Sequence, residues 1–257
     1  TLTALNWGFK IMSTMAELLA GSVGTVALPA LSRAVARRER EEERRTIRDT
    51  LEISLVVVSP AVVLSLLLDQ NIMRLVFERG SFTAESTALM ARIFFYYSLS
   101  LVFFSFVRVL TFYLFARHEA GAYFRLCLLL YSLNVAFDLL YVGAFRLGAV
   151  GIPLGLLTAY IVTIVLGFQR NIADLQAALD RAFGLFTLKN LLGAGLAGVV
   201  VAILCNWLGR PGTGLENFLY LCWICGSGTL VFFATLMITR AIPYGRFAET
   251  FRTRDKP

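Results

Sequence analysis

The stretch from Asn190 to Gly209, NLLGAGLAGVVVAILCNWLG, decides the class of this protein, because it runs for 20 residues without a charged side chain. About 20 apolar residues are what a helix needs to cross the hydrocarbon core of a bilayer. The stretch contains the spacing G-x-G-x-x-G from Gly193 to Gly198, but no strand precedes it, so a nucleotide-binding fingerprint is rejected. Small residues at helical spacing instead indicate a membrane helix that packs closely against its neighbours.

Similar uncharged runs recur along the whole chain. Its 257 residues are 58% hydrophobic and have a mean hydropathy of +0.71, whereas a soluble domain is usually about 45–50% apolar. We therefore predict an all-α polytopic membrane protein with about seven transmembrane helices. The predicted spans are residues 4–31, 51–69, 89–115, 123–145, 149–168, 187–208 and 216–239.

The basic residues are divided unevenly between the predicted loops. If the first helix runs from outside to inside, 17 of the 24 Lys and Arg residues lie in inside loops or in the tail, and five lie outside. The positive-inside rule then predicts an N-terminus outside and a C-terminus in the cytoplasm. The net charge of +7 is thus a topology signal, and no nucleic-acid partner is predicted.

The composition is continuous, which predicts a single membrane domain with three parts. Residues 1–170 hold five spans, with a charged cytoplasmic helix expected at 33–48, where Arg alternates with Glu and Asp49 follows directly. Residues 171–186 carry apolar side chains at helical spacing and are expected to form an interfacial amphipathic linker. Residues 187–257 hold the last two transmembrane helices and a basic cytoplasmic tail.

Two cations and a carboxylate lie inside the long apolar runs. A charge in the hydrocarbon layer costs at least about 2.5 kcal/mol on insertion scales, so it usually faces a water-filled cavity or a partner. Lys10 and Glu17 are seven residues apart and share one face of the first helix. We expect Lys10 to lie on a cavity wall, with snorkelling to the outer interface as the alternative. Arg108 either snorkels inward or adds to the positive charge of the cavity.

A second polar group is expected on the fourth and fifth predicted spans. Asn134 and Asp138 are one turn apart on the fourth span, and Thr158 lies on the fifth. Their oxygens suit a hard cation such as sodium if other helices add ligands. The alternative is a hydrogen bond between helices. The sequence contains no catalytic or metal-binding motif, so no enzyme activity and no cofactor apart from a possible coupling sodium ion are predicted.

Several segments resemble the MurJ/MviN family of lipid II flippases. They are Gly24–Arg33 (GTVALPALSR), Arg74–Phe82 (RLVFERGSF, with F-E-R-G-x-F), Arg108-Val-Leu before Phe115-Ala-Arg117-x-Glu119, and Leu133–Leu140 (LNVAFDLL). The resemblance implies the fourteen-helix fold of the MOP exporter superfamily, with two six-helix lobes around a basic cavity and two further helices. This chain resembles helices 8–14, so a preceding seven-helix half is expected as its partner.

The resemblance also implies a function and a compartment. A flippase of this family moves an undecaprenyl-diphosphate-linked peptidoglycan precursor, lipid II, across the bacterial cytoplasmic membrane by alternating access. Lys10, Glu17 and Arg108 are the expected substrate-binding residues, and Asn134, Asp138 and Thr158 the expected sodium ligands. Besides this lipid-linked diphosphate, the partners are membrane lipids. The alternatives are another MOP exporter, for O-antigen or drug-like cations, and a non-transporting scaffold without the first lobe.

The chain departs from the family pattern in its first helix. Relatives often have A-D-R-L-M-E there, and this chain has GFKIMS from Gly8 to Ser13. Lys10 keeps the cation, whereas Phe9 and Ser13 replace the two acids. Glu17, one helical turn beyond Ser13, is a candidate replacement for one of those acids.

Overall fold

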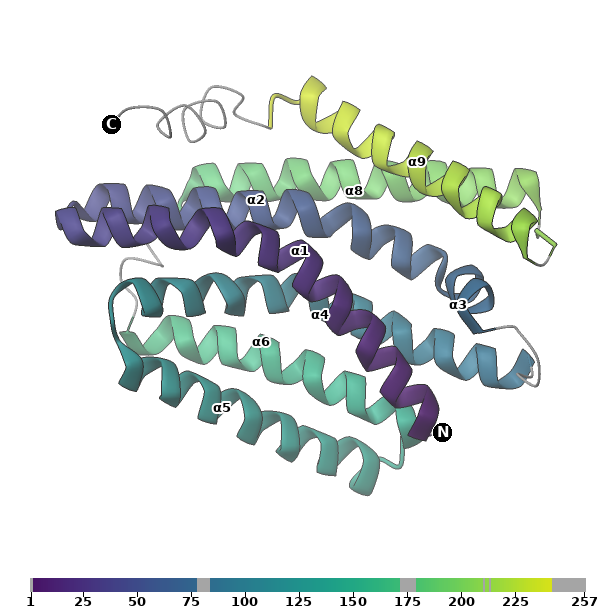
Figure 1. Cartoon of the computed structure of the whole chain (residues 1–257), viewed down its shortest axis with the longest axis horizontal. Helices are drawn as coiled ribbons and strands as arrows, with labels where there is room; N and C mark the ends of the chain where they lie inside the picture. The colour runs from purple at the N-terminus through teal and green to yellow at the C-terminus, as the bar shows by residue number, and fades with distance from the viewer. Residues whose placement is uncertain (1, 78–83, 172–178, 210, 213, 242–257) are drawn as a thin grey trace.

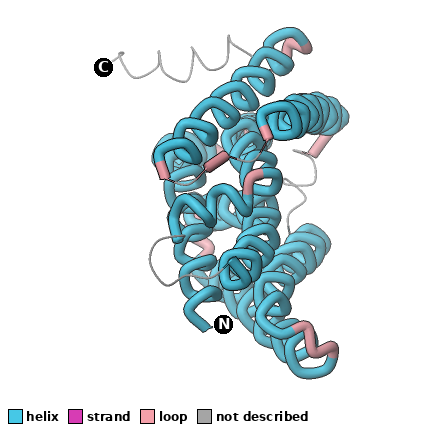
Figure 2. Tube along the Cα trace, turned by 90° about the vertical axis from the view of Figure 1, so that its right-hand side faces the viewer, coloured by secondary structure: helices cyan, strands magenta, loops and turns pink. Residues whose placement is uncertain are grey.

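The structure is a computed structural model that describes every residue except 1, 78–83, 172–178, 210, 213 and 242–257. Within the described part all regular secondary structure is helical, joined by short loops (Figure 2). Seven helices are long and apolar enough to cross a membrane. The prediction of an all-α multi-pass membrane protein is therefore confirmed. Most of the F-E-R-G-x-F motif, much of the predicted linker and most of the basic tail lie outside the described residues.

The helices are labelled in Figure 1. In chain order they are α1 (Leu2–Arg37), α2 (Arg40–Leu67), α3 (Asp69–Phe77), α4 (Ala84–Ala116), α5 (Ala120–Asp138), the π-helix η1 (Leu139–Ala144), the 3-10 turn η2 (Gly148–Val150), α6 (Gly151–Asn171), α8 (Arg181–Leu208) and α9 (Leu215–Ile238).

The sequence predicted one charged helix over residues 33–48, and this prediction is wrong. Residues 33–37 are the last turns of α1, and residues 40–48 are the first turns of α2. The chain reverses between them because Arg38 adopts a positive φ of 57°, a conformation that does not continue a right-handed helix. The alternating charges instead pair across the hairpin, as Arg37 and Glu42 do at 3.6 Å.

The predicted amphipathic linker is also wrong over its described C-terminal part. Residues 181–186 already belong to α8. The Asp180 side chain caps this helix by accepting a hydrogen bond of 2.9 Å from the Phe183 N–H, so α8 begins earlier than the apolar run suggests. That bond and the nearby Arg48 guanidinium hold the pKa of Asp180 below its ordinary value. Phe183 and Phe186 are buried in the core and do not form the exposed apolar face of a separate amphipathic helix.

Helix α4 runs through the middle of the fold, in contact with α1, α2, α3, α5 and α6. Helices α1 and α4 run in the same direction, which follows from two close approaches. A side chain at Gly8 would meet Ile93 at 2.8 Å. Sixteen residues further on, a side chain at Gly24 would collide with the Phe112 ring. Each residue of α1 therefore lies beside the residues of α4 whose numbers are higher by 85 to 89.

The α8–α9 hairpin packs on α2 and α3 at one edge, and α5 with α6 forms the other edge (Figure 1). Buried polar bonds fasten the hairpin. Asn190 Nδ2 donates to Ser59 Oγ of α2 at 2.6 Å, and Asn217 Nδ2 donates to the Asn71 carbonyl at 3.0 Å. In the rejected nucleotide motif, Gly193 packs against Phe232 of α9. Gly198 likewise packs against Val63 of α2, whereas no atom lies within 4 Å of a Cβ placed at Gly195.

Candidate functional site in the membrane-embedded charges

The face of α1 that carries Lys10 and Glu17 is open in this structure. Both side chains are exposed, and neither forms an ion pair among the described residues. The Lys10 ammonium lies 5.2 Å from the centre of the Trp7 ring, a cation–π contact that the sequence analysis missed. The hydroxyls of Ser13 and Thr14 donate to the Lys10 carbonyl at 3.0 and 2.8 Å. The charged groups of Lys10 and Glu17 are thus available on this face to bind a ligand or another protein surface.

Glu17 does not fold back towards Lys10. Its carboxylate lies 3.9 Å from the position that a Cβ would take at Gly21, on the next turn in the C-terminal direction. The cation and the carboxylate therefore occupy separate levels of the same stripe. An exposed Lys and an exposed Glu in the span of a membrane helix need water or a second protein surface beside them, and this open face is where either would lie.

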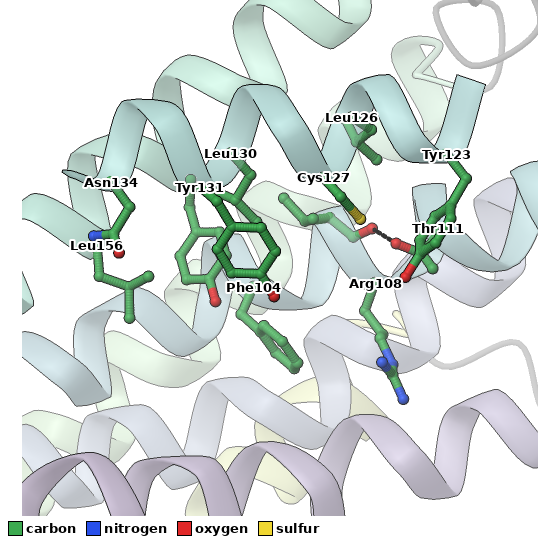
Figure 3. Close-up of a pocket in the computed structure, with 12 residues that line it drawn as sticks. Phe104, Arg108, Thr111, Tyr123, Leu126, Cys127, Leu130, Tyr131, Asn134 and Leu156 are labelled. Carbon is green, nitrogen blue, oxygen red and sulfur yellow. Dashed lines mark hydrogen bonds between the residues drawn. The ribbon is translucent and has the colours of Figure 1, made fainter. Parts of the chain in front are cut away.

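Arg108 lies on α4 beside a cavity of about 140 Å³ between α4, α5 and α6. Its guanidinium stacks on the Phe112 ring at 5.2 Å, and its Nε is buried without a hydrogen-bond partner in the described structure. Figure 3 shows the side chain pointing away from Tyr123 and Cys127, which line the cavity from α5. The described residues lining the cavity include no acid, so the counter-charge of Arg108 is not found there.

The structure places Lys10 and Arg108 on adjoining helices but at different depths. The shared direction of α1 and α4 sets Lys10 beside residues 95–99 of α4. Arg108 is about ten residues further along, which corresponds to ~15 Å along the helix axis. The expected substrate-binding residues are therefore spread along the α1–α4 contact and do not form one clamp.

The expected sodium ligands are only partly brought together. Asn134 Nδ2 donates to Asp138 Oδ1 at 3.4 Å, a long hydrogen bond within α5. Thr158 Oγ1 donates to the Leu154 and Gly155 carbonyls of its own helix, at 2.9 and 3.0 Å. In this structure the hydroxyl thus bonds to its own backbone, and the three side chains do not converge as a ligand set.

Two features around Asp138 were not predicted. The carboxylate occupies the space where a side chain at position 155 would lie, so Gly155 is what allows α6 to approach it. The spacing Gly151-x-x-x-Gly155 is itself typical of close helix packing, and the residue that packs against Gly155 here is Asp138. In addition, the helix continues after Asp138 as the π-helix η1, and π-helical turns occur frequently at functional sites.

Comparison with known proteins gives one consistent result. The family described as "Lipid II flippase MurJ" matches residues 1–220. Among curated proteins, "Probable lipid II flippase MurJ" of Rhizobium meliloti is 25% identical, over 97% of this chain and 49% of that protein. The protein of the same description from Thermotoga maritima is 28% identical, over 75% of this chain and 38% of its own length.

A solved structure shares the fold. The structure titled "Lipid II flippase MurJ, inward closed conformation" matches with a TM-score of 0.71 and 19% sequence identity, over 92% of this chain and 46% of that one. At that identity the likeness concerns the fold. The chain spans about half, or less, of the proteins that it matches.

Proposed function

Because the chain belongs to the family of the lipid II flippase MurJ, we propose that it is one lobe of a flippase for lipid II, an undecaprenyl-diphosphate-linked precursor, in the bacterial cytoplasmic membrane. The observation that carries this proposal is the open face of α1. There, Lys10 and Glu17 are exposed within a predicted span and have no ionic partner among the described residues. A transporter cavity supplies the water and the charged ligand that such a face needs.

A second lobe is part of this proposal. The chain spans about half the length of Rhizobium meliloti MurJ, and among the described residues α1 is covered by α2 and α4 on one side only. A second lobe beside the exposed stripe would enclose a cavity, and movement of the two lobes would open it alternately to each side of the membrane. We further propose that this chain is the C-terminal lobe, with its N-terminus outside and its C-terminus in the cytoplasm.

Within the cavity, Lys10 is the proposed binding group for the diphosphate. An ammonium group binds phosphate oxygens as a compact charge with three donors. Arg108, ~15 Å further along the α1–α4 contact, is the proposed second cation. Two cations at two depths suit a headgroup that passes through the membrane, because each holds the diphosphate at a different stage. The Glu17 carboxylate extends from α1 towards the level of Arg108 and keeps the path from being uniformly positive.

Replacement of the native flippase tests this function. The complete gene product is expected to restore growth to a bacterium depleted of its own lipid II flippase, and to expose labelled lipid II on the outer leaflet. Cells that express a soluble protein of similar size at the same level are the control. Growth failure together with export of O-antigen-type lipids or cationic drugs would favour another exporter. Normal accumulation with no export of any of these substrates would favour a scaffold.

We also propose a coupling sodium ion at Asn134 and Asp138, with Thr158 joining after its hydroxyl rotates away from the α6 backbone. Asp138→Asn is expected to raise the sodium concentration needed for half-maximal translocation by at least about tenfold, because it removes the only charge among these ligands. Translocation in proteoliposomes over a sodium series measures this. Thr158→Val is the companion variant, and a smaller shift in the same direction is expected.

An unchanged sodium response in Asp138→Asn would rule out this site. The Asn134–Asp138 bond would then be a packing contact within α5, positioned against Gly155.

A further inference from the structure

The Glu17 carboxylate and Arg108 lie at the same level along the α1–α4 contact. Phe112 packs over Gly24, and Arg108 lies one turn before Phe112 on α4. Because the two helices run in the same direction, Arg108 lies beside the turn of α1 that precedes Gly24, at Gly21. The Glu17 carboxylate lies over that same glycine, 3.9 Å from its Cβ position.

Neither of these two charges has an ionic partner among the described residues. Arg108 Nε is buried with no hydrogen-bond acceptor, and its guanidinium rests on the Phe112 ring. Glu17 is exposed and takes part in no ion pair within the described part of the chain. A charged group in a membrane span is stabilised by pairing, so both residues gain when they meet.

Other candidate partners are less suitable. Glu52 on α2 is buried and already lies 3.9 Å from Arg48 Nε. Asp138 accepts from Asn134 and packs against Gly155 of α6. Lys10 is two turns above Glu17 on the same helix, ~10 Å along the axis, and the Glu17 carboxylate is turned the other way. Arg108 is therefore the cation that best fits Glu17.

We propose that Glu17 is the internal counter-ion of Arg108. The two side chains form a reversible ion pair across the α1–α4 contact, and a phosphate group competes with Glu17 for the guanidinium. Arg108 is stacked on Phe112 in the present structure, and a rotation of its side chain towards Gly21 makes the pair. The competing ligand is a lipid-linked diphosphate, and this part of the inference depends on the proposed function.

The pair has a clear effect on transport. A cation with no counter-ion in a low-dielectric cavity holds a diphosphate tightly and releases it slowly. A carboxylate that pairs with the guanidinium stabilises the empty site relative to the loaded one. It therefore lowers the affinity of the site for the diphosphate and speeds release of the diphosphate. Glu17 thus has a positioning role, acting on the substrate through Arg108.

Charge reversal tests the ion pair without any ligand. In the purified complete gene product, Glu17→Arg and Arg108→Glu are each expected to lower the thermal unfolding midpoint by about 2–4 °C. The double variant, which restores opposite charges, is expected to regain at least half of the summed loss. Lys10→Glu combined with Glu17→Arg is the matched control, and its effects are expected to add. Additive losses in the Glu17–Arg108 pair, or recovery only in the Lys10–Glu17 pair, would overturn the proposal.

Binding and turnover then test the competition. The probe is undecaprenyl diphosphate, offered to the complete gene product in lipid nanodiscs. Glu17→Gln is expected to bind it about tenfold more tightly, as loss of a competing charge-assisted hydrogen bond would produce, while translocation slows. Thr14→Val, which removes a polar group from the same face without changing charge, should leave the affinity unchanged.

The results separate the two proposals. Weaker or unchanged binding in Glu17→Gln would overturn the competition. No binding by the unmodified protein would instead contradict the proposed function, and the ion pair would still be decided by the unfolding midpoints.

Discussion

Lys10→Ala in the complete gene product is expected to reduce lipid II translocation by at least about 100-fold, while the protein still accumulates in the membrane. The size follows from losing a charge-assisted contact to phosphate in a site screened from bulk water, where such contacts are strongest. Because the Lys10 side chain is exposed and its ammonium lies over the Trp7 ring, its removal should cost little stability.

Lys10→Arg is the matched control and should retain translocation, since it keeps the charge and its planar guanidinium can bind two phosphate oxygens at once. Translocation is measured as appearance of labelled lipid II on the outer leaflet, normalised to the amount of protein in the membrane. A fully active Lys10→Ala protein would end the diphosphate-binding role of this residue. Loss of the protein from the membrane would show instead that Lys10 is structural.

Gly24→Ala is expected to have the largest effect on folding. The added methyl group would overlap the Phe112 ring, and crowding of this kind in a packed interior costs about 1–3 kcal/mol. The ring is itself buried, so it cannot simply swing into lipid. Arg108 rests on this ring, so the substitution should disturb a proposed substrate-binding residue as well as the helix contact.

Gly195→Ala on α8 is the control for Gly24→Ala. No atom lies within 4 Å of the Cβ that this change adds, so the unfolding midpoint should stay the same or rise, as expected for Ala in a helix. The double variant Gly24→Ala with Phe112→Leu should regain stability, because the smaller side chain makes room for the methyl group. Equal midpoints for Gly24→Ala and Gly195→Ala would show that α1 and α4 are not tightly packed at Gly24.

The sequence predicted the spans well because hydropathy over about 20 residues depends on the solvent rather than on neighbouring helices. It misjudged the ends of elements, where single residues decide. Asp180 starts α8 by capping Phe183, and Arg38 reverses the chain between α1 and α2. The short helix α3 was missed, since its nine residues are too few for a span.

The candidate site was predicted in part, for a related reason. Lys10, Glu17, Arg108 and Asp138 could be selected because charges stand out in apolar sequence. Their surroundings depend on contacts between helices far apart in the chain, which a sequence read alone does not reveal. The Phe112 ring under Arg108, the separate depths of Lys10 and Arg108, and the fit of Gly155 to Asp138 all come from tertiary packing.

The hydrogen bond between Asn190 and Ser59 can form only after both residues have been synthesised and inserted into the membrane. The two residues are 131 positions apart, so at 5–20 residues per second the ribosome adds the second roughly 7–26 s after the first. During that interval Ser59 lies in the bilayer without its partner, which a serine tolerates by bonding to a carbonyl of its own helix. An amide has more hydrogen-bonding groups to satisfy than a hydroxyl, and Asn190 is the partner made last. Asn190, which is the more costly of the two to leave without a hydrogen bond, therefore enters the membrane when its acceptor Ser59 is already in place.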